Sequence, residues 1–184
     1  LLAIALLTAL WHIPYVPNFE HVRGEHPALY QWLRDDPTTG PVASLSREAD
    51  NLPFFARRAV VTAYEYAIPY SRGYILPFRA RTAAVAKALY AFDAQALQAW
   101  LDTSKPAYVL LEHRWLDARR VSRSWWAHDL PELARMVTDR LERGDVPILA
   151  ALSSPCLAWS GGDLSLVSAA CLTDRLNVAN GHPP

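Results

Sequence analysis

An uncharged apolar run opens the chain, from Leu1 to Trp11, and the sequence that follows has the mixed composition of a water-soluble domain. A transmembrane helix needs about 20 apolar residues to cross a hydrocarbon core about 30 Å thick. Trp11 ends the run and Tyr15 lies shortly after it, as aromatic side chains do at a membrane–water boundary, and Pro14 and Pro17 stop a helix. We therefore expect residues 1–17 to be the C-terminal part of a membrane-anchoring helix. The core of a signal peptide and a buried N-terminal helix are the alternatives.

The remaining residues, 18–184, are enough for one domain with a buried core. Positive and negative side chains balance at 18 each, and no basic stripe with interleaved aromatic residues is visible. Since nucleic-acid binding depends on positive charge, a nucleic-acid partner is not expected. Seven Trp and eight Tyr are many for this length, which favours a domain that packs against another molecule.

Apolar periodicity and turn residues predict helices that alternate with strands. The helices are expected at 27–34, 79–90, 94–101 and 131–143. The strands are expected at 42–45, 59–62, 108–111, 147–152 and 164–170. An ordered surface loop is expected at 64–78, and a hairpin turn at 159–163. This alternation predicts an α/β fold, a single three-layer domain with a mostly parallel sheet.

The strongest candidate for a ligand- or partner-binding site is the polar loop at 46–53, directly after the first predicted strand. Open α/β sheets usually bind ligands at the carboxyl ends of their strands. The candidate residues are Glu48, Asp50, Asn51, Arg57 and Arg58. The two acids have the spacing with which some glycosyltransferases hold a divalent cation, and the two arginines could hold an anion. The alternative is a solvated loop in which the acids pair with the arginines.

Sequence patterns for other chemistry are missing. The six histidines are scattered without metal-binding spacing, and the two cysteines do not form a C-x-x-C pair. Ser153 and Ser154 lie outside any nucleophile-elbow pattern. We therefore expect no catalytic residues, no metal site and no cofactor in this chain.

Two further pairs of residues are candidates for specific roles. Trp125 and Trp126 are adjacent, so they cannot both point into one core, and with Trp11 and Tyr15 they are candidates for a surface that faces a partner or membrane. Cys156 and Cys171 are either joined in a disulfide, as an oxidising compartment would allow, or are two buried thiols.

The stretch from 28 to 112 resembles a known class of domain. It runs Ala-Leu-Tyr-Gln-Trp-Leu, then Val-Ala-Ser-Leu-Ser-Arg-Glu-Ala-Asp-Asn-Leu-Pro-Phe-Phe-Ala-Arg-Arg-Ala-Val, then Tyr-Ala-Phe-Asp and Tyr-Val-Leu-Leu. It resembles the extracytoplasmic C-terminal α/β domain of bacterial polytopic membrane proteins related to the C-type, lipid-phosphosugar-dependent glycosyltransferases. The resemblance implies that the domain lies in the periplasm or outside the cell. In that class the catalytic acid lies on a loop between early transmembrane helices, whereas Glu48 and Asp50 lie in the soluble domain.

The sequence favours two functions. The first is a non-enzymatic accessory or structural subunit of a larger membrane complex, respiratory or photosynthetic, with one span in the bacterial inner membrane and its domain in the periplasm. Its expected partners are integral membrane subunits and membrane lipid. The second is the C-terminal domain of a polytopic membrane glycosyltransferase. A small-ligand-binding module that uses the loop at 46–53 is a third possibility.

Overall fold

A computed structural model describes residues 24–67 and 71–179 of the 184-residue chain. The expected anchor at 1–17, with Trp11 and Tyr15, lies outside these described residues. Within the described ranges, no helix combines the length and the apolar character that crossing a bilayer requires.

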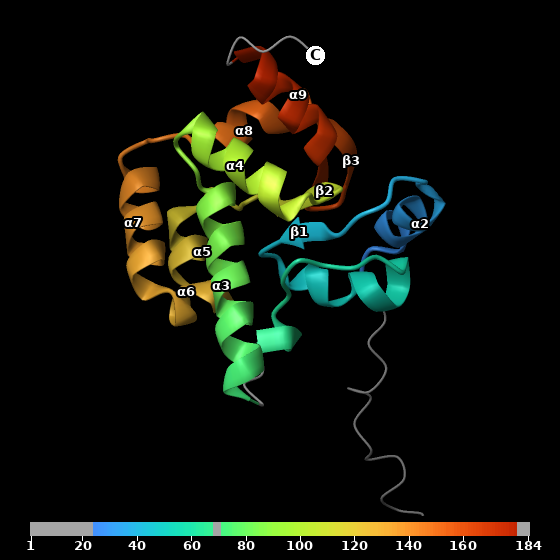
Figure 1. Cartoon of the computed structure of the whole chain (residues 1–184), viewed down its shortest axis with the longest axis horizontal. Helices are drawn as coiled ribbons and strands as arrows, with labels where there is room; N and C mark the ends of the chain where they lie inside the picture. The colour runs from blue at the N-terminus through green and yellow to red at the C-terminus, as the bar shows by residue number, and fades with distance from the viewer. Residues whose placement is uncertain (1–23, 68–70, 180–184) are drawn as a thin grey trace, which may run out of the picture.

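The described residues form one mixed α/β domain (Figure 1). Its α-helices are α2 (Pro27–Asp35), α3 (Arg72–Leu89), α4 (Ala94–Ser104), α5 (Ala118–Ser122), α6 (Trp125–Asp129), α7 (Pro131–Glu142), α8 (Ile148–Ser153) and α9 (Ala169–Ala179). Its strands are β1 (Val42–Ser44), β2 (Tyr108–Glu112), β3 (Leu157–Gly161) and β4 (Leu164–Ser168). Three short turns of other helix types are η3 (Arg47–Asp50), η4 (Leu52–Ala56) and η5 (Glu65–Ala67).

The strands form one sheet in the order β1-β2-β4-β3. β1 and β2 are parallel, with Ala43 opposite Val109, while β4 is antiparallel to both β2 and β3. The prediction of a mostly parallel sheet is therefore wrong, and the sheet is mixed. The cause is the tight turn between β3 and β4, where Gly162 has a φ of +61°, a conformation that glycine adopts without strain. A turn this short can join only antiparallel strands.

Two short apolar segments differ from their predicted strands. Residues 147–152 were expected to form a strand, but Ile148–Ser153 is helix α8, and Leu149 lies fully buried in the core. Short apolar runs fit a buried strand and a buried helix equally well, so periodicity alone cannot separate them. Residues 59–62 form no strand, and their contribution to the sheet is a single bridge between Val60 and Val42.

Helix α3 begins earlier than its sequence predicts. The expected loop at 64–78 contains η5, and α3 already starts at Arg72 and includes Pro77. Proline removes one helical hydrogen bond and disfavours a helix interior, which is why the aromatic, proline-containing segment looks like a loop in the sequence. In the structure Tyr74 stacks on Phe78, and its hydroxyl donates to the carbonyl oxygen of Tyr66, 2.8 Å away. These contacts hold the first turns of α3 against η5.

Other predicted elements are confirmed. Helix α2 begins at Pro27 as expected, and α7 begins at Pro131. The Asp93 carboxylate accepts a hydrogen bond from the backbone N–H of Gln95 at the start of α4. The apolar run 108–111 is strand β2, whose central position leaves these four residues buried.

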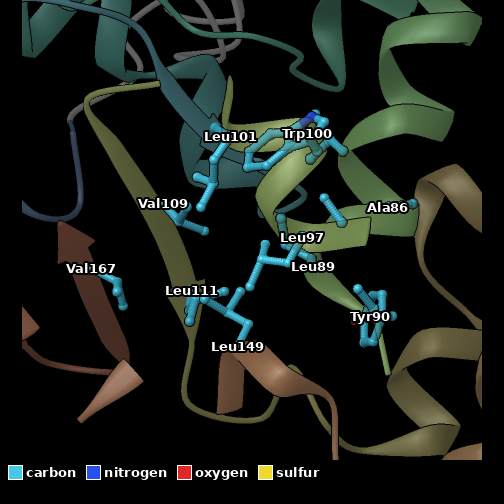
Figure 2. Packing of buried hydrophobic residues seen from close by; sticks show 14 of the residues in the cluster. Ala86, Leu89, Tyr90, Leu97, Trp100, Leu101, Val109, Leu111, Leu149 and Val167 are labelled. Atoms are coloured by element: carbon cyan, nitrogen blue, oxygen red, sulfur yellow. The ribbon is translucent and has the colours of Figure 1, made fainter. Parts of the chain in front are cut away.

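Helices cover both faces of the sheet. Alternate residues of β2 point to opposite faces, so Tyr108 and Leu110 pack beneath α2 and η4, whereas Val109 and Leu111 face the larger core. Figure 2 shows this larger core, in which Leu149 of α8 lies beside Leu111. Since both faces are covered, the exposed ends of β1 and β2 become the places where side chains from several elements can meet.

Candidate functional site

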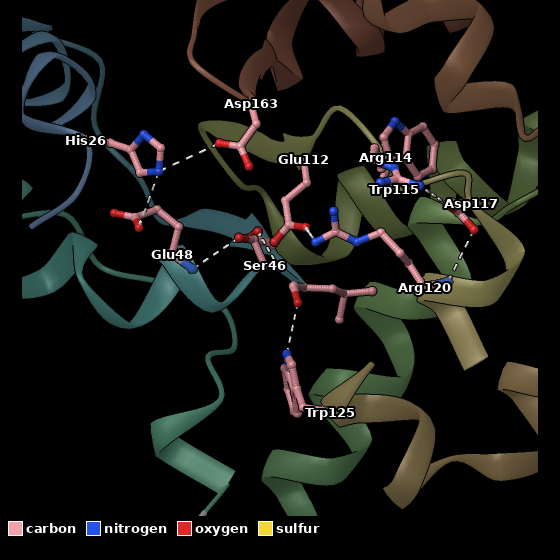
Figure 3. A network of polar contacts seen from close by, with 12 residues as sticks. His26, Ser46, Glu48, Glu112, Arg114, Trp115, Asp117, Arg120, Trp125 and Asp163 are labelled. Atoms are coloured by element: carbon pink, nitrogen blue, oxygen red, sulfur yellow. Dashed lines mark hydrogen bonds and ion pairs between the residues drawn. The ribbon is translucent and has the colours of Figure 1, made fainter. Parts of the chain in front are cut away.

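A cavity of about 470 Å³ lies at the carboxyl ends of the parallel strands β1 and β2. We call it the β1–β2 pocket. Its wall is built from the chain after β1, the chain after β2, and the segment from α5 to α6 (Figure 3). The polar and aromatic residues that line it are Ser46, Arg47, Tyr90, Glu112, Arg114, Trp115, Asp117, Arg119, Arg120, Arg123, Ser124, Trp125 and Trp126. This is the position at which α/β sheets commonly bind ligands.

Serine side chains hold the first wall of the pocket, which is the chain after β1. The buried Ser44 hydroxyl donates to the carbonyl oxygen of Leu110, 2.9 Å away on β2, and accepts from the backbone N–H of Ser46 at 3.0 Å. The Ser46 hydroxyl in turn accepts from the backbone N–H of Glu48 at 3.1 Å and so caps η3. These hydrogen bonds turn the chain sharply after β1, and Arg47 lies at the edge of the pocket with its guanidinium 4.1 Å from the centre of the Tyr64 ring.

Two ion pairs hold the second wall of the pocket, which runs from the chain after β2 to α6. The Arg120 guanidinium lies 2.7 Å from Glu112 Oε2, and that of Arg114 lies 2.8 Å from Asp117 Oδ2. Asp117 also caps α5, because its carboxylate accepts from the backbone N–H groups of Arg119 and Arg120. Partial desolvation by itself would raise the pKa of Asp117, but the hydrogen bonds from Arg114 and from these two N–H groups outweigh it and lower the pKa below its usual value. Asp117 is therefore a fixed negative charge that holds the start of α5.

The two adjacent tryptophans have different environments. Trp126 is 1% exposed and packs against Tyr90 in the core, so it is not available to a partner in this structure. Trp125 is half-buried beside the pocket, where its indole N–H donates to the carbonyl oxygen of Leu45 at 2.9 Å (Figure 3). Its ring also contacts Tyr64 edge-on. Both tryptophans therefore contact the same core cluster, Trp126 from within it and Trp125 from its partly exposed edge, and an interface role for Trp125 stays a prediction.

Glu48 is a structural residue of the segment after β1. It is 8% exposed, and it accepts hydrogen bonds from the Tyr30 hydroxyl and from the Asn51 side chain. His26 Nε2 lies 3.9 Å from Glu48 and 3.8 Å from Asp163, as Figure 3 shows. Burial, followed by the hydrogen bond to Glu48, raises the pKa of Tyr30 well above its usual value. Glu48 thus links α2 to η3, Asn51 supports its carboxylate, and both lie outside the pocket lining.

The other candidates in this segment also have structural surroundings. Asp50 accepts from the backbone N–H of Glu65 at 2.8 Å, and burial raises its pKa despite this hydrogen bond. Arg58 donates to the carbonyl oxygens of Leu33, Thr38 and Asp36 and forms an ion pair of 3.1 Å with the Asp36 carboxylate. Arg57 is exposed and has a left-handed backbone conformation at the end of η4. The predicted acid pair is therefore not brought together to hold a cation.

Neither a metal site nor a candidate for one is visible in the described ranges, which contain no group of three or more His, Cys, Asp or Glu side chains placed to hold an ion. The two cysteines are joined in a disulfide, which links the segment before β3 to α9. The structure thereby selects one of the two states that the sequence left open.

Among the residues after β2 that line the pocket, only Trp125 and Trp126 were predicted site residues, and the arginines and acids of this stretch were not. Four arginines lie within ten residues at 114, 119, 120 and 123, directly after a buried strand. This clustering of arginines could have indicated the site from the sequence, because it predicts a local concentration of positive charge at a strand end in a chain whose net charge is zero. The neighbouring acids, Glu112 and Asp117, gave the stretch an ordinary mixed charge.

Comparison with known proteins gives a likeness of fold. No protein-family model matches the chain, and no curated protein matches it in sequence. Among solved structures, the fold is similar to the C-terminal globular domain of an oligosaccharyltransferase from Archaeoglobus fulgidus, with a TM-score of 0.52 and 11% sequence identity. The likeness covers 80% of this chain and 98% of that domain. It agrees, at the level of fold, with the resemblance to C-terminal domains of membrane glycosyltransferases.

Proposed function

We propose that this chain is the extracytoplasmic globular domain of a larger membrane-bound glycosyltransferase, in which it binds a ligand or partner and does not itself make or break the glycosidic bond. The observation that carries the proposal is the likeness of fold to the C-terminal domain of an oligosaccharyltransferase, which extends over nearly all of that domain. Folds host many functions, so the proposal needs support from the chemistry of this chain as well.

Two features support the extracytoplasmic location. The disulfide between Cys156 and Cys171 is of a kind that persists in the bacterial periplasm or outside the cell and is rare in the cytosol. The apolar run Leu1–Trp11 has the composition of a membrane-embedded segment, and it precedes the domain directly. Together they favour a domain held at the outer side of a membrane.

The surroundings of the acidic side chains support a binding role. A glycosyl-transferring site needs a carboxylate that is free to act on the substrate as a base or to hold a metal ion. In the β1–β2 pocket, Glu112 and Asp117 each lie against an arginine, and Asp117 also caps α5. Glu48 accepts hydrogen bonds from Tyr30 and Asn51. These carboxylates are engaged in contacts that stabilise the fold, and the arginine-rich pocket is suited to binding a ligand.

The test is the size of the native polypeptide in membranes of the source organism, measured with an antibody raised against residues 24–179. The proposal predicts a band several-fold larger than this 184-residue chain, because the transferase would carry many more spans. The accessory-subunit hypothesis predicts a single-span polypeptide close to this length that migrates with other integral membrane subunits in a native gel. Such a result would contradict the proposal.

A further inference from the structure

The β1–β2 pocket carries a concentration of positive charge. The whole chain has a formal net charge of zero, with 18 basic and 18 acidic residues. The pocket is lined by five arginines but only two carboxylates, Glu112 and Asp117, an excess of three positive charges. Two of the five guanidinium groups are paired with these carboxylates, and the repulsion among the remaining positive charges would be offset by a bound anion. An uneven distribution of this kind in a neutral chain indicates a negatively charged ligand.

We propose that the β1–β2 pocket binds a phosphate or a phosphate ester, through Arg119 and Arg123 from one wall and Arg47 from the other. The inference goes beyond the proposed function and does not depend on it, because it rests on the chemistry of the pocket alone.

The ion pairs of the second wall leave two arginines available. Arg114 and Arg120 are paired with Asp117 and Glu112, whereas Arg119 and Arg123 have no ion-pair partner within residues 24–67 and 71–179. Both line the cavity, and their side chains are exposed to solvent there.

The framework around these two arginines is fixed. Asp117 caps α5 with two hydrogen bonds, and Val121 anchors the same helix in the core at 3% exposure. Arg119 and Arg123 are four residues apart at this helix and its C-terminal cap, so they project from one side of it. The paired arginines hold the wall, and the two unpaired ones are presented together to the cavity.

Phosphate fits this arrangement better than a carboxylate does. A phosphate monoester carries a charge of about −1.5 to −2 near neutral pH and offers three strong acceptor oxygens, whereas a carboxylate carries a single charge. Guanidinium groups bind such oxygens through paired, parallel hydrogen bonds. The cavity, at about 470 Å³, has room for more than the phosphate itself. Trp115 and Trp125 lie in its wall and offer aromatic surface to the carbon part of an ester.

The experiment is a calorimetric titration of the 184-residue chain, in mild detergent at low ionic strength, with inorganic phosphate, inorganic pyrophosphate, phenyl phosphate and benzoate. We expect saturable one-site binding of the three phosphates, with phenyl phosphate far tighter than benzoate, which has the same ring and a carboxylate. The double variant Arg119→Gln/Arg123→Gln should bind at least about tenfold more weakly, since it loses charge-assisted hydrogen bonds.

The matched control is Arg175→Gln, which makes the same change at an exposed site on α9, a helix that packs against α4, α8 and β4. It should bind phosphate as the unmodified chain does. Thermal unfolding of each variant establishes that it is folded, and the exposed positions of Arg119 and Arg123 predict unchanged unfolding temperatures. Absence of saturable phosphate binding would overturn the proposal. So would equal affinity for benzoate, or the same weakening in Arg175→Gln as in the double variant.

Discussion

Removing the disulfide between Cys156 and Cys171 should lower the stability of the domain substantially. The bond closes a loop with a sequence separation of 15 between the segment before β3 and helix α9. In the chain-entropy model, a loop of this size stabilises the folded state by about 3 kcal/mol, because the cross-link restricts the unfolded chain. For a chain of this length, each kcal/mol corresponds to roughly 2–4 °C in the unfolding temperature. We therefore expect the variant Cys156→Ala/Cys171→Ser to unfold roughly 6–12 °C below the unmodified chain.

The assay is thermal unfolding followed by circular dichroism, with and without dithiothreitol. Cys156 is 3% exposed, so replacing it also removes a buried sulfur atom. The reduced, unmodified chain keeps both sulfurs and separates the loss of the cross-link from this change in packing. Dithiothreitol should lower the unfolding temperature of the unmodified chain and leave that of the variant unchanged. Equal unfolding temperatures of the unmodified chain with and without the reductant would show that the disulfide does not stabilise the fold.

Three further predictions concern residues around the sheet. Trp126→Ala should lower the free energy of unfolding, measured by urea denaturation, by about 3–5 kcal/mol, because Trp126 is buried in the core. Trp125→Ala, at a half-buried site with one hydrogen bond, should lower it by about 1 kcal/mol, and equal losses would contradict the different burial of the two rings. Arg58→Ala should cost about 3 kcal/mol because it leaves the Asp36 carboxylate and several carbonyl oxygens without their donor, and Arg58→Lys should restore only part of this. Burial raises the folded-state pKa of Asp50 above 3.8, so the protonated side chain contributes stability below pH 3.8, and this stability is lost as the pH rises through the raised pKa. The variant Asp50→Asn has no charge to bury, so its stability should increase relative to that of the unmodified chain between pH 3 and neutrality. Parallel stability–pH curves of the two proteins would contradict this.

The sequence predicted α2, α4, α7, the C-terminal part of α3 and the strand β2, because their signals are local, whereas α5, α6, α8 and α9 were not predicted as helices. Prolines at the starts of α2 and α7 and an aspartate before α4 mark helix ends by chemistry that does not depend on the rest of the fold. The direction of the strands depends on connections instead. The β3–β4 hairpin makes the sheet mixed, and its first strand begins at a half-exposed Leu157 without the apolar run that marks β2.

The sequence predicted a candidate loop at the end of the first strand, but it could not show which polar side chains of that loop serve the fold. The carboxyl end of β1 does border the pocket, as the general behaviour of α/β sheets indicates. Glu48 and Asp50 are not part of the pocket lining, and Glu48 instead contacts Tyr30, 18 residues away in the sequence. Whether a polar side chain serves the fold or a ligand depends on such distant partners. Arg58 is a second case, since it donates to the carbonyl oxygen of Leu33 in α2 and to those of Asp36 and Thr38 in the chain between α2 and β1.

A role of this domain in a membrane glycosyltransferase is tested by measuring sugar transfer in membranes from the source organism. Two strains would be compared: one with the native gene, and one in which the segment encoding residues 24–179 is replaced by the same segment carrying Arg119→Gln, Arg123→Gln and Trp125→Ala. Transfer of a radiolabelled sugar to membrane or periplasmic acceptors should fall several-fold in the altered strain, while the altered protein remains at its normal level in the membrane. Unchanged sugar transfer, with the altered protein present, would contradict the claim that this domain binds a ligand or partner for a membrane glycosyltransferase.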